Sequence, residues 1–485
     1  MNPPMNPPMS PMTPMMFFQP IRGGGAPTLV DQVAQALQSA MESQLLRPGM
    51  ALPSVRQFAR NHGLSTYTVA AAYGRLAAQG WLAARPGSAY RVVPRAAARA
   101  AVRAAPWRPP KMGESWLLAD VFADHSIPIK SGCGWLPSEW LNEAGLQQSL
   151  RQLARVPAAQ IAGYGHPYGY APLREHMLGV LAERGVAAQP AQIVLTQGAT
   201  QALDIVIRTL FRAGDTVLVE LPCYANLLPC LHLAGLQILG VPRTADGLCV
   251  ETLQRLAASH PVKGLFVNTV LHNPTGTSLS MANAFQVLQV AERHGFWVIE
   301  DDVSRDLLPG IGPMLLALAG TRRVVHVSGF SKSITPSVRV GYIVAADELA
   351  AAFVRTRMAM SLTPAEMLER TVYQVLRQGR HQAHLARVRD RLGEAHETLC
   401  GLMDEHGFEV YARPGAGLFL WARPAGAWRE RGAARLAETA LRDGIWLAPG
   451  GYFDPTGADA GWLRFNVAYS LDPLLWKFMR RVGAA

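Results

Sequence analysis

The residues best suited to covalent chemistry lie between Val327 and Gly341, where the chain reads V-S-G-F-S-K-S-I-T-P-S-V-R-V-G. Lys332 follows an apolar run and precedes Arg339 by seven positions. A lysine on a buried loop can lose its proton and attack an aldehyde to form a Schiff base. An arginine nearby can hold a phosphate through two parallel N–H bonds. An aldehyde and a phosphate together describe pyridoxal 5′-phosphate (PLP), although a lone Lys–Arg pair is more often two solvated surface charges.

Polar residues that suit the ring of this cofactor follow two strand-like runs upstream. Asp301 comes after the apolar run 296–299, and a carboxylate at a strand end can keep a pyridine nitrogen protonated, as PLP requires. Asn273 comes after the apolar run 264–267, and its amide can donate to the phenolate oxygen of the ring. Each residue also has a plainer explanation, because Asn273 begins an N-P-T-G turn and Asp301 could cap a helix.

A Gly-Ala-Thr segment lies between a strand-like run at 193–195 and a helical pattern at 201–210. The start of a helix offers free N–H groups and the positive end of the helix dipole to a phosphate. Tyr224 can stack on the pyridine ring, or it can be an ordinary core residue. The succession of these residues after apolar strands favours one cofactor site, made of Gly198, Ala199, Thr200, Tyr224, Asn273, Asp301, Ser331, Lys332 and Arg339.

With these motifs, residues from about 125 to 480 resemble fold-type I PLP enzymes of the aspartate aminotransferase class. The segment W-L-R-F-N at 462–466 is similar to the one whose arginine binds a substrate carboxylate in that class. The resemblance implies an α/β domain whose mixed, mostly parallel sheet has helices on both faces, and a small C-terminal α+β lobe. It also implies that Lys332 and Asp301 are the catalytic pair, and that Arg464 binds the carboxylate of a substrate or effector.

The chain departs from that class next to the aspartate. A tyrosine usually follows it by two or three residues and donates to the phenolate oxygen, whereas this chain has Val303 and Ser304. Loss of that donor favours a protonated imine at Lys332. The position three before the lysine, often Ser or Thr, is Gly329. These changes leave the PLP prediction in place and lower the expectation of efficient catalysis.

Most of the net charge lies at the N-terminal end of the chain. The first 111 residues hold 12 Lys or Arg and 2 Asp or Glu, so they carry +10 of the net charge of +11. Such asymmetry indicates a polyanionic partner for this part, either DNA or RNA. A basic tail that only solubilises the protein would have the same charge, so the pattern beneath the charge must decide.

The apolar pattern in this basic part predicts three helices and a hairpin. The helices extend over 28–46, from 53 to 63 and from Ser65 to about residue 80, and the strands over 81–85 and 89–93. This order is typical of a winged helix-turn-helix, in which the third helix enters the major groove of DNA. A three-helix packing unit without a nucleic-acid role would show the same periodicity. The residues expected to contact DNA are Arg56, Ser65, Thr66, Tyr67, Thr68, Arg85, Ser88 and Arg91.

Residues 28–93 resemble the GntR class of bacterial regulators, on L-P-S-x-R at 52–56, S-x-x-T-V at 65–69 and A-Y-x-x-L at 72–76. A GntR-type head on an aminotransferase-like body is similar to the MocR subfamily. That resemblance implies binding of double-stranded operator DNA, a head-to-tail, domain-swapped homodimer, and sensing of PLP or of an amine or amino acid. Thr66 stands where an arginine is common in the class, and Ala89 replaces a frequent glycine of the wing.

The chain is therefore expected to have four parts: a disordered Met/Pro-rich tail (1–25), the DNA-binding domain (26–93), a basic Ala/Arg/Pro linker (94–115) and the PLP-binding domain (116–485). The five cysteines are scattered and no His/Cys cluster is apparent, so neither a disulfide framework nor a metal site is expected. We expect a reducing cytoplasmic location, at the nucleoid when DNA is bound. No apolar run reaches the roughly 18 residues that span a bilayer, so no membrane partner is expected.

Three functions are consistent with these observations. The leading hypothesis is a regulator that senses PLP or an amine at Lys332 and changes its contact with operator DNA. The enzyme alternative is a working aminotransferase with a vestigial DNA-binding head, and the missing tyrosine and the intact helix-turn-helix pattern argue against it. A DNA-binding protein whose large domain only dimerises is the third. The retained Lys332, Asp301, Asn273 and Arg339 argue against a pure scaffold.

Overall fold

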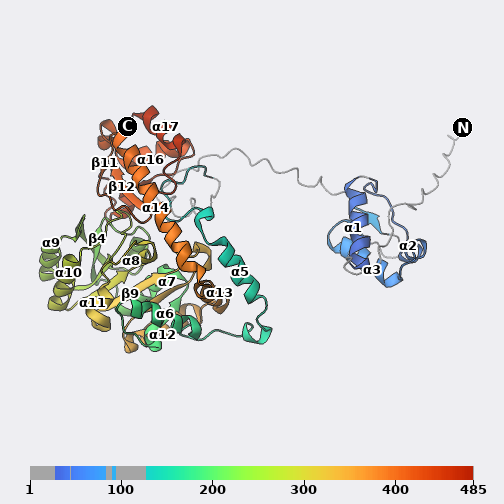
Figure 1. Cartoon of the computed structure of the whole chain (residues 1–485), viewed down its shortest axis with the longest axis horizontal. Coiled ribbons are helices and arrows are strands. Elements are labelled where there is room, and N and C mark those ends of the chain that lie inside the picture. Colours follow the sequence, from blue (N-terminus) through green and yellow to red (C-terminus); the bar gives the residue numbers. More distant parts are fainter. Residues whose placement is uncertain (1–27, 44, 84–89, 94–126, 484–485) are drawn as a thin grey trace. The chain divides into compact units, whose positions relative to one another are not determined.

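The computed structural model describes residues 28–43, 45–83, 90–93 and 127–483. They belong to two compact units, one within residues 1–106 and the other within 107–485 (Figure 1). The predicted tail (1–25) and linker (94–115) lie outside the described residues.

The N-terminal unit is the predicted winged helix-turn-helix. Its elements are α1 (Leu29–Glu42), α2 (Val55–Asn61), α3 (Thr66–Ala78), β1 (Leu82–Ala83) and β2 (Arg91–Val92), with the two strands antiparallel. The hydroxyls of Thr28, Ser54 and Ser65 each accept a hydrogen bond from a backbone N–H in the first turn of the following helix. Such caps satisfy N–H groups that have no partner within the helix, so these three residues fix where the helices begin.

The buried residues of this unit agree with the predicted periodicity, but one helix ends earlier than predicted. Val33, Val69 and Tyr73 are fully buried between the helices. We predicted that the first helix continues to residue 46, but it ends at Glu42. Leu46 is buried although it lies in the turn beyond the helix, where its N–H donates to the carbonyl of Ala40. Because Leu46 packs into the core from a turn, its apolar side chain continued the helical pattern, and the predicted helix was too long.

The C-terminal unit contains a large lobe built on an eight-stranded sheet of order β3-β10-β9-β8-β7-β4-β5-β6. Neighbouring strands are parallel, except that β10 is antiparallel to β3 and β9, and β6 to β5. The strands are β3 (Ile193–Thr196), β4 (Thr216–Leu221), β5 (Gln237–Thr244), β6 (Gly247–Leu248), β7 (Val262–Asn268), β8 (Trp297–Asp301), β9 (Val324–Gly329) and β10 (Gly341–Val344).

Helices cover both faces of this sheet, as predicted (Figure 1). Along β4, the side chain of Leu218 enters one core cluster, while Val217 and Val219 enter the cluster on the opposite face. Strands buried on both faces are nearly continuously apolar, as parallel sheets require. The helices are α5 (Glu143–Leu153), α6 (Ala171–Glu183), α7 (Gly198–Leu210), α8 (Leu227–Leu233), α9 (Val250–Ser259), α10 (Met281–His294), α11 (Leu315–Ala319), α12 (Asp347–Ser361) and α13 (Glu366–Arg377).

The predicted small α+β lobe is present, with an antiparallel sheet of order β11-β12-β14-β13. It has its own apolar core, which also receives side chains from the long helix α14, between Val388 and Met403. Among the described residues, no helix is both long and apolar enough to cross a membrane. The elements are α14 (Arg380–Glu405), β11 (Glu409–Val410), β12 (Phe419–Arg423), α15 (Ala427–Arg431), α16 (Ala433–Arg442), β13 (Ala448–Pro449), β14 (Leu463–Asn466) and α17 (Pro473–Val482).

One end of the large sheet brings together the segments that we singled out from the sequence. Asn268, the last residue of β7, pairs with Asp301, the last residue of β8. Gly341, at the start of β10, pairs with both Gly329 of β9 and Thr196 of β3. The carboxyl ends of parallel strands are where open α/β sheets bind ligands. The chemistry of the large lobe is therefore expected at this end.

Candidate cofactor and DNA-binding sites

Lys332 lies in the turn that follows β9, and its environment favours the neutral amine. Its Nζ donates a hydrogen bond to the backbone carbonyl of Gly134. Burial, with the nearby Arg464 guanidinium as the second cause, lowers the pKa of Lys332 to about 8. A neutral amine is the nucleophilic form of lysine, so a useful fraction of this side chain can attack a carbonyl group near neutral pH.

Arg339 and the start of α7 place two positive groups side by side. Arg339 has left-handed backbone angles (φ 46°), and its Nη2 donates to the carbonyl of Gln197 at 3.4 Å. Gly198, the first residue of α7, has φ 83°, and a Cβ there would lie 2.5 Å from the same Nη2. No carboxylate pairs with Arg339 within the described part of the chain. A guanidinium next to the positive end of a helix calls for an anion, and a phosphate suits both groups.

This close approach predicts a strong effect of Gly198→Ala. The new methyl group would displace the Arg339 guanidinium, so we expect phosphate and PLP affinity to fall by about tenfold or more, the loss of one charge-assisted bond. Gly214→Ala is the matched control, because Gly214 has a similar φ (89°) but no atom within 4 Å of a Cβ. Titration of PLP absorbance checks both variants. Equal affinities in the two would contradict the phosphate site.

Asp301 is a buried carboxyl group without a cationic partner. Burial raises its pKa to about 7, and the neighbouring Asp302 acts in the same direction. The backbone N–H of Val303 donates to Oδ1 at 3.3 Å and opposes this shift. No ion pair forms with Asp301 within the described residues. A protonated ring nitrogen would supply the missing positive charge, which fits the role expected for this residue.

Arg464 lies on β14, with its guanidinium between the rings of Phe419 and Phe453, 4.7 and 4.9 Å from their centroids. Nη1 donates to Oδ1 of Asn273 at 2.8 Å, and Nη2 donates to the carbonyl of Gly132 at 2.6 Å. Its Nε is buried and has no hydrogen-bond partner among the described residues. Burial lowers the pKa of Arg464 to about 10. A buried guanidinium with an unused donor and no acidic partner is suited to bind a carboxylate.

The remaining predicted cofactor residues lie around this centre. Asn273 uses its oxygen for Arg464, so its amide nitrogen is the group left to donate to a ring oxygen. The Tyr224 hydroxyl accepts from Asn226 at 3.1 Å, and burial raises its pKa. A hydrogen bond with Thr200 opposes that shift. Ala199 continues the first turn of α7, and Ser331 precedes Lys332 in the turn after β9.

Sequence reasoning missed three contributors to the site. Gly132 and Gly134 act through backbone carbonyls, for which side-chain types give no signal. Asn268 links Asp301 to Asn273, the two residues expected to contact the pyridine ring. Its Nδ2 donates to the carbonyl of Asp301 at 2.9 Å, and its Oδ1 accepts from the N–H of Asn273 at 3.5 Å. Asn268 could have been found, because it ends an apolar strand just as Asp301 does.

A buried acidic cluster lies next to the site. Glu300, Asp302 and His326 have potential metal-ligand atoms within 4.8 Å of one another. The Glu300 carboxylate already accepts hydrogen bonds from Thr269, His326 and the N–H groups at the start of α11. Asp302 pairs with Arg305. Both Glu300 oxygens and Oδ2 of Asp302 hold these partners, while Oδ1 of Asp302 and Nε2 of His326 have none among the described residues. Because most of the possible ligand atoms are engaged, we read the cluster as part of the structure of the sheet end.

In the N-terminal unit, the predicted DNA-contacting residues are largely exposed. Tyr67 is 80% exposed in the first turn of α3. Thr66 and Arg56 are also exposed, and Thr68 is half-buried. Ser65 uses its hydroxyl to cap α3, accepting from the N–H of Thr68 at 3.0 Å. Arg91 is exposed, although one of its nitrogens donates to the carbonyl of Gly49 at 2.9 Å. The other two predicted residues, Arg85 and Ser88, lie outside the described residues.

Arg56 offers a direct test of this surface. It is exposed and forms no ion pair within the described residues, so its charge is available to a phosphate. We expect Arg56→Ala to weaken DNA binding equally for all sequences and to lower the salt dependence by about one released counterion. Fluorescence anisotropy at several salt concentrations measures both. Arg75→Ala is the control, since Asp31 already neutralises Arg75, and an equal change in both variants would argue against a phosphate contact by Arg56.

Comparison with known proteins agrees with both sites. Residues 144–480 match the family model "Aminotransferase class I and II", and residues 29–92 match "Bacterial regulatory proteins, gntR family". The chain belongs to the aminotransferase class I and II family. It carries this domain behind a gntR-family DNA-binding domain, the combination found in GntR-type regulators such as those of the MocR subfamily. PLP is the cofactor that this family implies, and the residues described above fit it.

Individual relatives match most of the chain. The HTH-type transcriptional regulator YdcR of Escherichia coli K12 is 29% identical over 449 residues, 90% of this chain and 94% of YdcR. The probable rhizopine catabolism regulatory protein MocR of Rhizobium meliloti is 27% identical over 386 residues, 77% of each chain. The crystal structure of LysN, an alpha-aminoadipate aminotransferase from Thermus thermophilus, covers 73% of this chain and 92% of LysN, with a TM-score of 0.67 and 24% identity. That likeness shows a shared fold.

Proposed function

We propose that this protein is a transcription regulator that binds operator DNA through α3 and senses an amine-bearing ligand at a PLP site centred on Lys332. The proposal rests on one observation: a single chain has both the residues suited to PLP and a DNA-binding unit. The large lobe has a lysine, an anion site and a carboxyl group suited to PLP. The small unit presents an exposed helix start of the gntR family.

Different residues are proposed to hold the phosphate, the ring and the aldehyde carbon of the cofactor. When bound, PLP supplies an aldehyde carbon that reacts with primary amines. Arg339 and the N–H groups at the start of α7 hold the phosphate, and Asp301 holds the proton of the ring nitrogen. Lys332 attaches the cofactor through its amine. Asn273 donates to the ring oxygen, and Tyr224 packs against the ring.

The ligand that competes with Lys332 is proposed to be an amino acid or a similar amine that carries a carboxylate. Arg464 lies close enough to lower the pKa of Lys332, and its Nε lacks a partner. A molecule with an amine for the cofactor and a carboxylate for Arg464 would use both groups at once. Such a ligand can shift the regulator between two states only if it binds them with different affinity.

The surroundings of Asp301 favour sensing over turnover. The positions where aminotransferases carry a tyrosine hold Val303 and Ser304, and the Ser304 side chain is buried at the start of a short 3₁₀ turn. Without a phenol donor, the ring oxygen has fewer groups to adjust its charge during proton transfers. The site can therefore exchange one amine for another, while the later steps of transamination lack a usual participant.

We further propose that two copies associate through the surface next to the anion site. Five apolar side chains are exposed between the end of α12 and the start of α13: Met358, Met360, Leu362, Met367 and Leu368. Leu368 also lines a cavity of about 310 Å³ that includes Arg339 and Gln197. A patch of this kind marks an interface, and a homodimer in head-to-tail arrangement would cover it. Sedimentation should give a dimer for the wild type and a monomer for Leu362→Asp.

A pair of assays separates this function from the enzyme alternative. A regulator should protect a segment of the DNA upstream of its own gene from nuclease, and should form at most one keto acid per PLP site. A working aminotransferase should form keto acid over many turnovers and leave the same DNA unprotected. The second outcome would overturn the proposal.

A further inference from the structure

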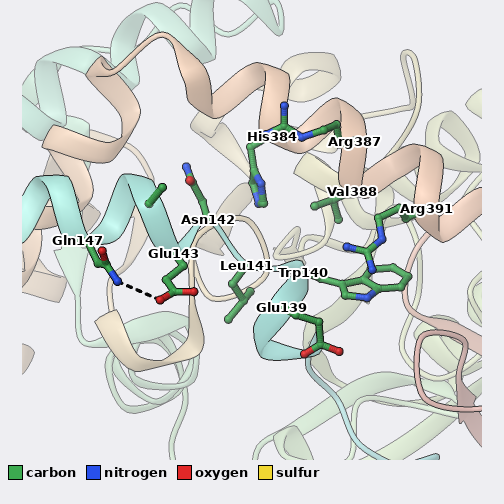
Figure 2. A pocket seen from close by; sticks show the side chains of 11 residues that line it. Glu139, Trp140, Leu141, Asn142, Glu143, Gln147, His384, Arg387, Val388 and Arg391 are labelled. Atoms are coloured by element: carbon green, nitrogen blue, oxygen red, sulfur yellow. Dashed lines mark hydrogen bonds between the residues drawn. The ribbon is translucent and has the colours of Figure 1, made fainter.

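A second pocket, separate from the cofactor site, lies where the long helix α14 passes the segment leading into α5 (Figure 2). Its volume is about 440 Å³, within the range of small-molecule sites. One wall is a single face of α14, with His384, Arg387, Val388 and Arg391 at helical spacing. The other wall is formed by residues 139–144 and Gln147.

The two walls carry opposite charges that do not meet. Arg387 and Arg391 lie on the α14 wall, and Glu139 and Glu143 lie on the facing wall (Figure 2). No ion pair joins them in the part of the chain that the structure describes. The acids hold only uncharged partners: Glu139 accepts from the Ser138 hydroxyl, and Glu143 accepts from the Gln147 amide. Each wall therefore keeps its charge available to a ligand between them.

His384 is an independent sign that this pocket receives a polar ligand. Its side chain points into the pocket (Figure 2), only 8% of the residue is exposed, and its ring has no hydrogen-bond partner among the described residues. Burial lowers the pKa of His384 to about 4, with His381 and Arg387 acting in the same direction. A neutral imidazole has one donor and one acceptor. Both ring nitrogens are accessible from the pocket, so they are available to a ligand or to water there.

The walls also provide apolar surface, and one of their arginines is held in place by an aromatic ring. Leu141 and Val388 line the space between the charged groups. The Arg391 guanidinium lies over the Trp140 ring at 4.0 Å, which holds this arginine in place. The same segment of chain carries Gly132 and Gly134, whose carbonyls bind Arg464 and Lys332. A short stretch of backbone thus connects the pocket to the cofactor site.

From these observations we infer that this pocket is a second ligand site, which binds a free amino acid with an aliphatic side chain. The carboxylate of the ligand pairs with Arg387 and Arg391, and its ammonium group pairs with Glu139 and Glu143. The side chain contacts Leu141 and Val388, and the His384 ring completes the polar contacts. A molecule with only one sign of charge would leave the opposite wall unpaired.

Equilibrium dialysis of the full-length chain with labelled L-alanine, L-valine and L-leucine tests this inference. Arg464→Gln serves as the background, because it removes the carboxylate partner proposed for the cofactor site. We expect this protein to retain at least one of the three amino acids. In that background, Arg391→Gln and Glu139→Gln should each weaken binding about tenfold or more, the usual loss of one charged hydrogen bond. Arg380→Gln is the control, since Arg380 is an exposed residue of α14 outside the pocket.

Single-charge analogues give a second readout. For L-leucine, 4-methylpentanoate keeps only the carboxylate and isopentylamine keeps only the ammonium group, so neither should displace the labelled amino acid. The inference is overturned if none of the three amino acids is retained in the Arg464→Gln background. It is also overturned if both pocket variants bind like the Arg380→Gln control, or if a single-charge analogue competes as well as leucine. Because the Arg464→Gln cofactor site is expected to keep its affinity for amines, the dialysis uses PLP-free protein. The outcomes then follow changes in the pocket alone and do not depend on whether the cofactor site works as proposed.

Discussion

Replacing Lys332 by alanine is expected to abolish covalent retention of PLP and to leave basal DNA binding unchanged. The Lys332 amine lies at this end of the sheet, where it donates to the carbonyl of Gly134, and its lowered pKa makes it reactive near neutral pH. The DNA-binding helices belong to a separate compact unit with its own core. Mass spectrometry after borohydride reduction should find the added mass on the wild type at Lys332, and none on the variant.

Lys263→Ala is the matched control, since Lys263 is an exposed lysine of β7 in the same unit. It should retain PLP like the wild type. The pH dependence adds a further check on the mechanism. Because Lys332 is neutral above its pKa of about 8, the rate of PLP capture by the unloaded protein should rise as the pH increases through 8 and then level off. Covalent labelling that persists in Lys332→Ala, or a well-folded variant that no longer binds DNA, would contradict the division of labour.

Replacing Arg464 by glutamine should weaken binding of a carboxylate-bearing amine at the cofactor site by about 30-fold or more, given the usual cost of removing a buried charged partner. The buried guanidinium has a free Nε, while Asn273 and Gly132 fix its other nitrogens. Affinity for an amine that lacks the carboxylate should change little. The shift in PLP absorbance on titration with leucine and with isopentylamine measures this difference.

Arg423→Gln is the control for this variant. Arg423 also lies over an aromatic ring, that of Trp462 at 4.5 Å, but Glu409 pairs with it. Its loss should leave both amines bound as in the wild type. An equal loss of affinity for leucine and isopentylamine in Arg464→Gln would indicate that Arg464 only supports the fold.

Most of the candidate cofactor residues could be located from the sequence because they follow an apolar strand. A polar residue after such a strand lies at the sheet end whatever the order of the strands, so Asp301 and Lys332 were placed without knowledge of the topology. The start of α7 was predicted three residues too late, at Gln201 instead of Gly198. Glycine and threonine favour helices weakly, so the apolar pattern alone did not include Gly198 and Thr200 in the helix.

Other features depend on contacts between distant parts of the chain. The partner of Lys332 is a backbone carbonyl of Gly134, and a carbonyl has no sequence signature. The left-handed backbone of Arg339 is likewise visible only in three dimensions. The second pocket joins the start of α5 to α14, two segments that are far apart in the sequence. Ser65 was predicted as the start of a helix and as a DNA contact, and the structure shows that its hydroxyl caps this helix.

The most direct test of the account is DNA binding by the full-length protein with and without PLP. Fluorescence anisotropy with the intergenic DNA upstream of its own gene should give two different isotherms for the unloaded and the PLP-loaded wild type. Lys332→Ala should give a single isotherm that PLP does not change. Identical isotherms for the unloaded and loaded wild type, with PLP retention verified in the same samples, would contradict the claim that the site at Lys332 controls DNA binding.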